Sequence, residues 1–313
     1  MRYSTLIAPI CLWAVPAAAN ASDCQPAFVN GDQSLVINGV EIEPGGRATQ
    51  DFEVRIKNAS GPVAGAPDDS PGMSMDVGPC KATIRIARIG ASPDPQSPIY
   101  ALRAPGNRQI EILPDAASGG TADSDIIIAN APPGPQGRNV PFQIGVSTEW
   151  GLRAGTYIEQ LELSLIDESG NVADRSTLTI TIIIPPAVSL RLVGAVVGGQ
   201  GSGPAQIDLG NLSSSSETRS ERFGALIFST ASYVVRFSSA NLGNLKHEEG
   251  REKVPYRLFF DGALVDLSGA SEFSYPNHTP QSGDRRSMSI VVPPVLALAG
   301  RYSDRVTVTV TAM

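Results

Sequence analysis

The side chains that most often carry chemistry are sparse in this sequence. It contains two histidines among 313 residues, and neither His247 nor His278 stands in a metal-binding spacing such as His-Glu-x-x-His. His247 belongs to a run of mixed charge, which is typical of a solvated hairpin tip. The segment Gly198–Gly203 lacks the lysine of a phosphate-binding loop, and no Gly-x-Ser-x-Gly nucleophile motif is present. We therefore expect a protein that is not an enzyme, with no catalytic residue, no bound metal and no cofactor. Paired carboxylates for glycoside hydrolysis stay open, because the distance between them depends on the fold.

Residues 1–21 have the pattern of a secretory signal peptide. Arg2 precedes an apolar stretch from Leu6 to Ala19, and Ala19-Asn20-Ala21 provides a cleavage site of small residues. The alternative is a membrane anchor, but the apolar stretch of about 14 residues is shorter than the roughly 20 that a spanning helix needs. We expect cleavage before Ser22 and export of the mature chain.

The cysteines agree with export. Cys11 lies in the leader, so Cys24 and Cys80 remain, and an even number is typical of proteins from oxidising compartments. A disulfide between them would close a loop on the order of 60 residues and contribute about 4 kcal/mol. The alternatives are two free thiols or a metal site, and cysteines without a neighbouring histidine make a poor metal site. We expect the disulfide.

Composition limits both the fold class and the partners. The chain has 31 Gly and 25 Pro, with 42% hydrophobic and 6% aromatic residues, which disfavours helical bundles and disorder and favours an all-β protein rich in turns. The formal net charge of −7 argues against a nucleic-acid partner, because binding one requires basic side chains that neutralise its phosphates. Residues 22–186 carry 20 acidic and 11 basic side chains, whereas residues 187–313 carry 11 and 12.

Short runs that alternate apolar and polar residues dominate the chain, as expected for antiparallel sheets with one buried face. Turn residues separate the runs, and no long window has a helical period. The sequence therefore predicts a β-sandwich architecture. The expected strands include Phe52–Lys57, Ala82–Ile89, Leu161–Ile166, Leu178–Ile184, Val188–Val193, Ala225–Ser229, Tyr233–Ser238, Val254–Phe260, Ser287–Val292 and Arg305–Thr311.

A domain boundary is expected at Pro185-Pro186, because two prolines cannot donate the hydrogen bonds of a sheet. The sequence thus divides into an N-terminal domain, residues 22–186, and a C-terminal domain, residues 187–313. Trp150 follows an alternating run and is expected in a core rather than in a ligand-binding surface.

The two domains share a short repeat. Ala154–Leu165 and Ala299–Val310 both read Ala-Gly-x-Tyr, then three residues, then an alternating strand. In the first domain another strand, Arg175–Ile184, follows the repeat. In the second domain the sequence stops at Met313, so we expect its last strand to be missing.

A sandwich without its last strand leaves an open edge that accepts a strand from another chain. We expect this acceptor groove to be lined by alternating apolar residues of two strands. They are Val306, Val308 and Val310 on one side and Val188, Leu190 and Leu192 on the other. The alternative is a complete domain in which a different strand closes the edge.

The C-terminal domain resembles the spore coat protein U domain, the pilin-type domain of archaic chaperone–usher pili. The matching segments are Leu245-Lys246-His247, Val254–Gly262 and Ala299–Val310, and the last is the most specific. The N-terminal domain matches only at Ala154–Leu165. The resemblance implies two immunoglobulin-like β-sandwich domains, of which the C-terminal one is incomplete. It also implies a periplasmic chaperone, an outer-membrane usher and a neighbouring pilus subunit as partners, and a location on the cell surface.

The N-terminus of this sequence differs from that of a shaft pilin, and the difference indicates where in a pilus the chain would lie. Cys24 lies close to the expected mature N-terminus, and no long alternating extension that could serve as a donor strand precedes it. This arrangement resembles the two-domain tip adhesin, which carries a binding domain in front of the pilin domain. The alternative is a self-contained secreted carbohydrate-binding or coat protein that does not polymerise.

The contacts of an adhesin are expected on loops held by a rigid sandwich. The candidates are the connections Ala66–Met75, Ala91–Ile99 and Ala129–Val140 of the N-terminal domain. Their candidate surface-binding residues are Pro71, Met73, Met75, Pro132 and Pro133. The alternative for the two methionines is that they fill gaps in the core.

Overall fold

The computed structural model describes residues 24–60, 78–90, 96–115, 125–198, 204–250, 252–269 and 271–313. Within these ranges the regular structure is β-strand, apart from one 3₁₀ turn, Pro105–Asn107. The all-β fold class expected from the sequence is confirmed. No helix in this part of the chain has the length and apolarity to cross a membrane. The expected leader and its cleavage site lie outside the described residues.

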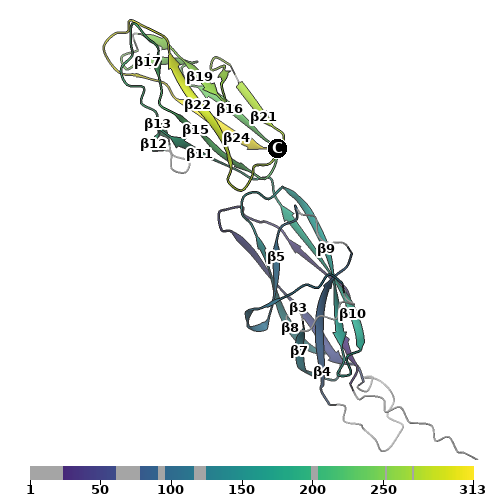
Figure 1. Ribbon diagram of the computed structural model, residues 1–313. Helices are drawn as coiled ribbons and strands as arrows, with labels where there is room; N and C mark the ends of the chain where they lie inside the picture. The colour runs from purple at the N-terminus through teal and green to yellow at the C-terminus, as the bar shows by residue number, and fades with distance from the viewer. Residues whose placement is uncertain are drawn as a thin grey trace, which may run out of the picture.

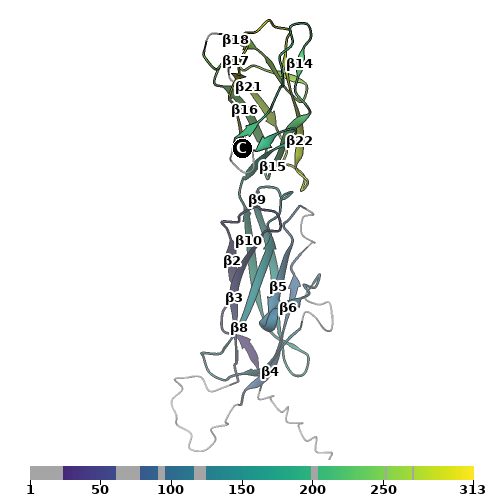
Figure 2. The same ribbon diagram turned by 90° about the vertical axis from the view of Figure 1, so that its left-hand side faces the viewer.

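The strands form two units placed end to end (Figures 1 and 2). The first unit contains two five-stranded sheets. One has the order β1 (Pro26–Phe28), β3 (Arg47–Asn58), β8 (Arg138–Ser147), β5 (Tyr100–Ala104) and β6 (Arg108–Ile110). The other has the order β2 (Gln33–Ile37), β10 (Val172–Ile184), β9 (Gly155–Ile166), β4 (Cys80–Arg88) and β7 (Ile126–Ala131).

Alternation along β10 builds the core of the first unit. Leu178, Ile180, Ile182 and Ile184 all point inward and are between 0% and 4% exposed. On one side β10 pairs antiparallel with β9, and on the other it pairs parallel with β2. The last strand of this unit is therefore hydrogen-bonded along both edges, and its inward side chains are buried.

The expected disulfide is present. Cys24 and Cys80 are bonded, with their Cα atoms 5.3 Å apart. The bond ties the start of the described chain to the first residue of β4. Because β1 begins two residues after Cys24 and pairs with β3, this end of the described chain is part of the sandwich.

The second unit has one large sheet and one smaller sheet that face each other across a core. The large sheet contains β11 (Val188–Gly194), β15 (Phe223–Ser229), β22 (Asp284–Val292), β19 (Arg257–Phe260) and β20 (Ala263–Val265), and β14 (Thr218–Arg219) also pairs with β22. The facing sheet has the order β21 (Ser271–Tyr275), β16 (Tyr233–Ser239) and β24 (Val306–Ala312). Phe237 and Phe260 pack edge to face in the core between them.

Two small sheets complete this unit. One joins β12 (Val197–Gly198) to β13 (Ala205–Gln206). The other has the order β18 (Lys253–Pro255), β17 (Asn244–His247) and β23 (Tyr302–Ser303). The single strand expected over Val254–Phe260 is thus two strands. The break falls at Tyr256, whose amide donates a hydrogen bond to the Gly243 carbonyl, so the chain leaves β17 and joins β22.

The expectation of a solvated hairpin tip at His247 is wrong for the imidazole. His247 is 5% exposed, because alternation along β17 places it on the same inward face as Leu245. Its Nε2 atom lies 3.2 Å from the Ala299 carbonyl oxygen, and its Nδ1 atom accepts a hydrogen bond from the Glu249 amide. The acceptor role of Nδ1 assigns the proton to Nε2.

The two units meet at Thr230 and the Pro185-Pro186 link. The Thr230 hydroxyl donates to the Pro185 carbonyl and accepts from the Ala187 amide, each at 2.8 Å. The Thr230 carbonyl accepts from the Ala154 amide, which precedes β9 of the first unit. Trp150, expected in a core, is 9% exposed and lies at this junction, with its ring centroid 5.5 Å from that of Phe228.

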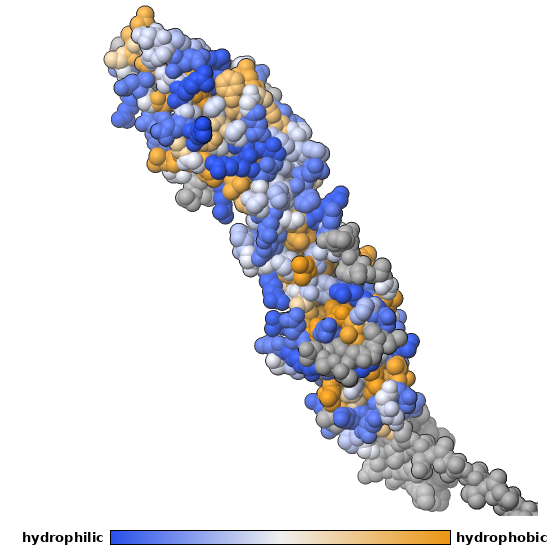
Figure 3. Space-filling model, in the orientation of Figure 1, coloured by the Kyte–Doolittle hydropathy of each residue, from blue (hydrophilic) through white to orange (hydrophobic). Residues whose placement is uncertain are grey.

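Apolar residues also reach the surface of both units, as Figure 3 shows in orange for one face. The exposed side chains are spread over different strands and connections. The most exposed are Leu296 at 87%, Ile99 at 80%, Val197 at 74% and Met313 at 69%.

Candidate acceptor groove between β11 and β24

β24 and β11 are the outermost strands of the two facing sheets in the second unit. In the described part of the chain, β24 is hydrogen-bonded to β16 alone and β11 to β15 alone. The two outer strands are neighbours in space without pairing with each other. Each therefore presents one open edge on the same side of the sandwich.

The main-chain groups at the open edge of β24 follow from its register. The Arg305 carbonyl accepts from the Ala240 amide, and the Met313 amide donates to the Ser232 carbonyl. In an antiparallel pair the hydrogen-bonding residues alternate. The odd-numbered residues of β24 therefore bond to β16. Val306, Val308 and Val310 direct their N–H and C=O groups outward.

The same alternation holds on β11. Its hydrogen bonds to β15 are flanked by a bond from the Thr230 amide to the Ala187 carbonyl and by one from the Ala195 amide to the Arg222 carbonyl. On the β11 side those bonds use odd-numbered residues, so the N–H and C=O groups of the even-numbered residues of β11 face the open edge. They are Val188, Leu190 and Leu192.

The six residues expected to line the groove share one environment. Val188, Leu190, Leu192, Val306, Val308 and Val310 are all half-buried and all pack against the core of the second unit. Between the valines of β24, Thr307 and Thr309 are exposed. The structure thus brings the six side chains to one core and places them on its two open edges.

The last strand of the first unit shows what a second neighbour changes. Ile180 of β10 lies between β9 and β2 and has no exposed area. Val308 of β24 has β16 on one side only, and its side chain stays half-buried. Both are inward-facing residues near the middle of an alternating strand, so the difference in exposure agrees with two neighbouring strands for β10 and one for β24.

Asp304 fixes the start of β24. Its carboxylate accepts hydrogen bonds from the Ser239 hydroxyl at 2.5 Å, the Tyr256 hydroxyl at 2.7 Å and the Asn241 amide at 3.0 Å. Burial, and then the bond to Asp304, raise the pKa of Tyr256 above its ordinary value. Asp304 thereby joins β24 to the turn after β16.

Gly300 and Tyr302 hold the segment before Asp304 against His247. A Cβ atom at position 300 would overlap the imidazole ring, so this close approach requires glycine. Tyr302 packs edge-on against the same ring, with centroids 5.0 Å apart, and its hydroxyl contacts Glu252 and the Leu298 carbonyl. The Ala-Gly-x-Tyr-Ser-Asp segment therefore positions the edge strand that follows it.

The repeat seen in the sequence has a common geometry. The Tyr157 hydroxyl donates to the Arg153 carbonyl at 2.8 Å, and the Tyr302 hydroxyl donates to the Leu298 carbonyl at 3.2 Å. In each unit the tyrosine thus bonds four residues back, around the glycine. The units differ beyond the motif, because β9 continues between two neighbours whereas β24 has one.

The structure describes only some of the candidate binding loops. Pro71, Met73 and Met75 lie outside the described residues, as does the first part of Ala91–Ile99. Pro132 and Pro133 lie in the connection between β7 and β8, where the Pro132 carbonyl accepts from the Asn58 amide and Pro133 is exposed. The loop expected over residues 129–140 is shorter, because both of its ends belong to strands.

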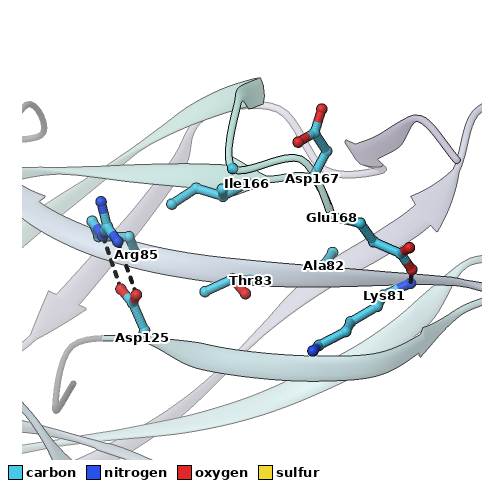
Figure 4. A pocket seen from close by; sticks show the side chains of 9 residues that line it. Lys81, Ala82, Thr83, Arg85, Asp125, Ile166, Asp167 and Glu168 are labelled. Atoms are coloured by element: carbon cyan, nitrogen blue, oxygen red, sulfur yellow. Dashed lines mark hydrogen bonds and ion pairs between the residues drawn. The ribbon is translucent and has the colours of Figure 1, made fainter. Parts of the chain in front are cut away.

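A polar hollow on the solvent face of β4 was not foreseen from the sequence. It is lined by side chains from β4, from the residue before β7 and from the turn after β9. Arg85 and Asp125 form a bidentate ion pair in it at 2.8 Å, although they are 40 residues apart in the sequence (Figure 4). The described residues contain no cluster of three or more His, Cys, Asp or Glu side chains suited to a metal ion.

Comparison with known proteins found similar solved structures. One is a chaperone–tip adhesion subunit pre-assembly complex, CsuC-CsuE, from the archaic chaperone-usher Csu pili of Acinetobacter baumannii. It has 16% identity and a TM-score of 0.46, and the match covers 90% of this chain and 99% of that one. Another is the CupB6 tip adhesin of Pseudomonas aeruginosa, with 11% identity, a TM-score of 0.37 and coverage of 91% and 94%.

A third is CfaE, the adhesive subunit of CFA/I fimbria of enterotoxigenic Escherichia coli. It has 10% identity, a TM-score of 0.34 and coverage of 91% of this chain and 99% of that one. No family model and no curated protein matches this chain.

Proposed function

We propose that this chain is a non-enzymatic subunit of a chaperone–usher surface pilus. Residues 187–313 form a pilin domain whose groove accepts a donor strand from a periplasmic chaperone or a neighbouring subunit. Residues 22–186 form the domain that mediates attachment at the pilus tip. The observation that carries the proposal is the pair of open edges on β11 and β24, both backed by half-buried apolar side chains.

An incoming strand would satisfy both kinds of exposed group at once. Its main chain would bond to the outward N–H and C=O groups of Val306, Val308 and Val310, and its apolar side chains would cover the core beneath. Such a strand needs alternating apolar residues, because only every second side chain points into the groove. At about 25 cal/mol per Å², burying a few hundred Å² of apolar surface would contribute several kcal/mol.

Two features support a place at the tip. Cys24 is bonded to Cys80, and β1 and β2 both pair within the first unit, so this part of the chain is used inside its own domain. The sequence resemblance to the two-domain tip adhesins points the same way. The disulfide also fits passage through the oxidising periplasm on the way to the cell surface.

The acceptor role is tested with the full chain and a candidate periplasmic chaperone. Co-expression is expected to yield a one-to-one complex, and an added peptide with alternating valines is expected to raise the unfolding temperature of the second unit. Val308→Asp places a charge in the groove and should abolish both effects. Thr309→Asp, on the exposed face of the same strand, is the matched control and should preserve both.

A full chain that is a stable monomer, ignores the chaperone and is not stabilised by the peptide would overturn the acceptor role. It would then be a self-contained secreted carbohydrate-binding or coat protein. The tip position has its own test, which is immunogold labelling of pili. Labels spaced along the shaft would contradict it.

A further inference from the structure

The connection between β22 and β23 carries two leucines that point away from the protein. From Pro293 to Leu298 the exposure alternates, and Val295 and Ala297 pack against the core of the second unit. The leucines alternate with them on the outer side, where Leu296 is 87% exposed and Leu298 is 54% exposed. In an extended segment with one buried side, the outward residues are ordinarily polar. This connection is instead apolar on both sides.

Hydrogen bonds hold the connection in place. The Val295 amide donates to the Ser213 carbonyl at 3.0 Å. The Leu298 amide donates to the Glu252 carboxylate, also at 3.0 Å. The next carbonyl along the chain, that of Ala299, lies 3.2 Å from the buried imidazole of β17. The two leucines are therefore presented at fixed positions, and a partner that covers them does not have to order the backbone beneath them.

The leucines lie at the outer end of the second unit, which is the end remote from the first unit. β24 ends beside the junction, because the Met313 amide donates to the carbonyl of Ser232, two residues after Thr230. β24 therefore starts at the outer end, and β23 precedes it there. The connection that leads into β23 contacts His247, the last residue of β17, and Figure 1 shows β17 at this outer end.

The acceptor groove runs between the junction and the outer end. β11 runs from the junction to Gly194, and β24 runs back from Val306 to the junction. At the junction the first unit already lies against the second, through the contacts of Thr230 and Trp150. A further unit that extends the row of Figures 1 and 2 is therefore placed at the outer end.

We propose that Leu296 and Leu298 form a docking surface for the folded domain of the neighbouring pilus subunit that supplies the donor strand. The inference rests on the proposed function, and it names a second contact with the same partner. The strand lies between β11 and β24, and the domain joined to that strand rests on the two leucines at the outer end.

The small size of the surface favours a partner that is already held in place. Stable protein interfaces bury roughly 800 Å² on each partner, and two leucine side chains offer far less than this. The surface alone would therefore not retain an independent protein. A domain tethered through an inserted strand is present at a high effective concentration, so a small apolar contact is enough to fix its position.

The docking surface and the groove have different roles. The strand supplies main-chain hydrogen bonds and covers the core, which holds the neighbouring subunit to this chain. A joint made by one strand leaves the orientation of the attached domain free. Contact with the two leucines fixes that orientation, and it requires apolar residues on the partner, because polar groups buried against leucine lose their hydrogen bonds to water.

The first test uses the full chain in assembled pili. A photo-crosslinking amino acid replaces Leu296, Thr307 or Leu264 in three separate variants. Thr307 lies on β24 beside the groove, whereas Leu264 is 59% exposed on β20, at the opposite edge of the large sheet from β11. After irradiation, the adducts are identified by mass spectrometry. We expect the same pilus subunit at positions 296 and 307 and no adduct at position 264.

The second test measures the affinity of the subunit identified in this way. Leu296→Asp combined with Leu298→Asp is expected to weaken binding of the whole subunit at least tenfold, because two carboxylates would be buried in an apolar contact. Binding of a peptide with the sequence of its donor strand should stay unchanged, since the peptide contacts the groove alone. Leu264→Asp is the matched control and should change neither affinity.

Three results would overturn the proposal. They are an adduct at position 307 without one at position 296, an adduct of position 296 with the chaperone alone, and equal affinity of the whole subunit for the parent chain and the double variant. Failure of the acceptor role is distinguishable from these. A groove that takes no strand gives no adduct at position 307 and binds no peptide, whereas both signals persist if only the docking surface is wrong.

Discussion

The Tyr256 hydroxyl donates a hydrogen bond of 2.7 Å to the Asp304 carboxylate. Tyr256 lies between β18 and β19, and Asp304 lies two residues before β24, so the bond holds these two segments together. The same carboxylate also accepts from Ser239 and Asn241. An edge strand with one neighbour depends on such contacts, because no second strand holds it in place.

Removal of this carboxylate should destabilise the second unit. Asp304→Ala leaves the partly buried Tyr256 and Ser239 hydroxyls without their acceptor, and we expect a loss of about 2–3 kcal/mol. Tyr256→Phe removes one bond and should cost about 1 kcal/mol. Urea unfolding of both single variants and of the double variant measures the coupling. Strictly additive effects would contradict a direct bond.

The two repeat glycines offer a matched pair of substitutions. Gly300→Ala drives a methyl group into the His247 ring, whereas at Gly155 the nearest atom, in the Tyr157 ring, would be 3.9 Å away. Their φ angles are similar, 148° and 158°, so backbone strain is common to both. We expect Gly300→Ala to cost about 1–3 kcal/mol more than Gly155→Ala. Equal unfolding temperatures for the two variants would show that the overlap is relieved without cost.

Alkaline pH should destabilise the protein. Burial is the largest cause that raises the pKa of Tyr100, Tyr233 and Tyr256 above the ordinary value. A phenol whose folded pKa exceeds its unfolded pKa stabilises the fold fully below about pH 10, and this stabilisation is lost as the pH rises further. Absorbance at 295 nm should show these tyrosines ionising only as the circular dichroism of the fold is lost. Ionisation of Tyr100, Tyr233 and Tyr256 near pH 10 in an intact fold would refute this.

The disulfide should stabilise the first unit alone. Replacement of Cys24 and Cys80 by serine is expected to cost about 4 kcal/mol, because the bond restricts a long loop of the unfolded chain. Calorimetry of the full chain in oxidised and reduced buffer measures the effect. The transition of the second unit should not move, and a shared shift would mean that the two units unfold together.

Trp150 should report on the junction by fluorescence. The chain has two tryptophans, and Trp13 belongs to the expected leader, so the emission of the mature chain comes from Trp150. Phe228→Ala removes the ring beside it and should shift the emission to longer wavelength. Ile158→Ala, at an exposed position of β9, should leave the spectrum unchanged.

Local sequence patterns predicted much of the fold because alternation is a local property. The runs around Phe52, Ile84, Leu163 and Ile180 all became strands with the expected inward face. The turn Asp167–Asn171 was also predictable, because an Asx turn uses side chains next to it in sequence. These features need no knowledge of distant residues.

Features that depend on distant pairings were not predictable. The parallel pairing of β2 with β10 joins residues far apart in the chain. Likewise Arg85 of β4 forms an ion pair with Asp125, which lies just before β7. The interruption at Tyr256 likewise needs Gly243 and Asp304 in place. The inward faces of β11 and β24 were predictable, because each is a regular alternating strand whose inward residues can be assigned by counting.

The junction at Thr230 has a mechanical consequence. β10 leads through Pro185 and Pro186 directly into β11, so a pull exerted between the far end of the first unit and the groove of the second travels along one continuous piece of backbone. The hydrogen bonds of Thr230 clamp that backbone on both sides of the link. We expect these bonds to resist bending at the link when force is applied to the two units.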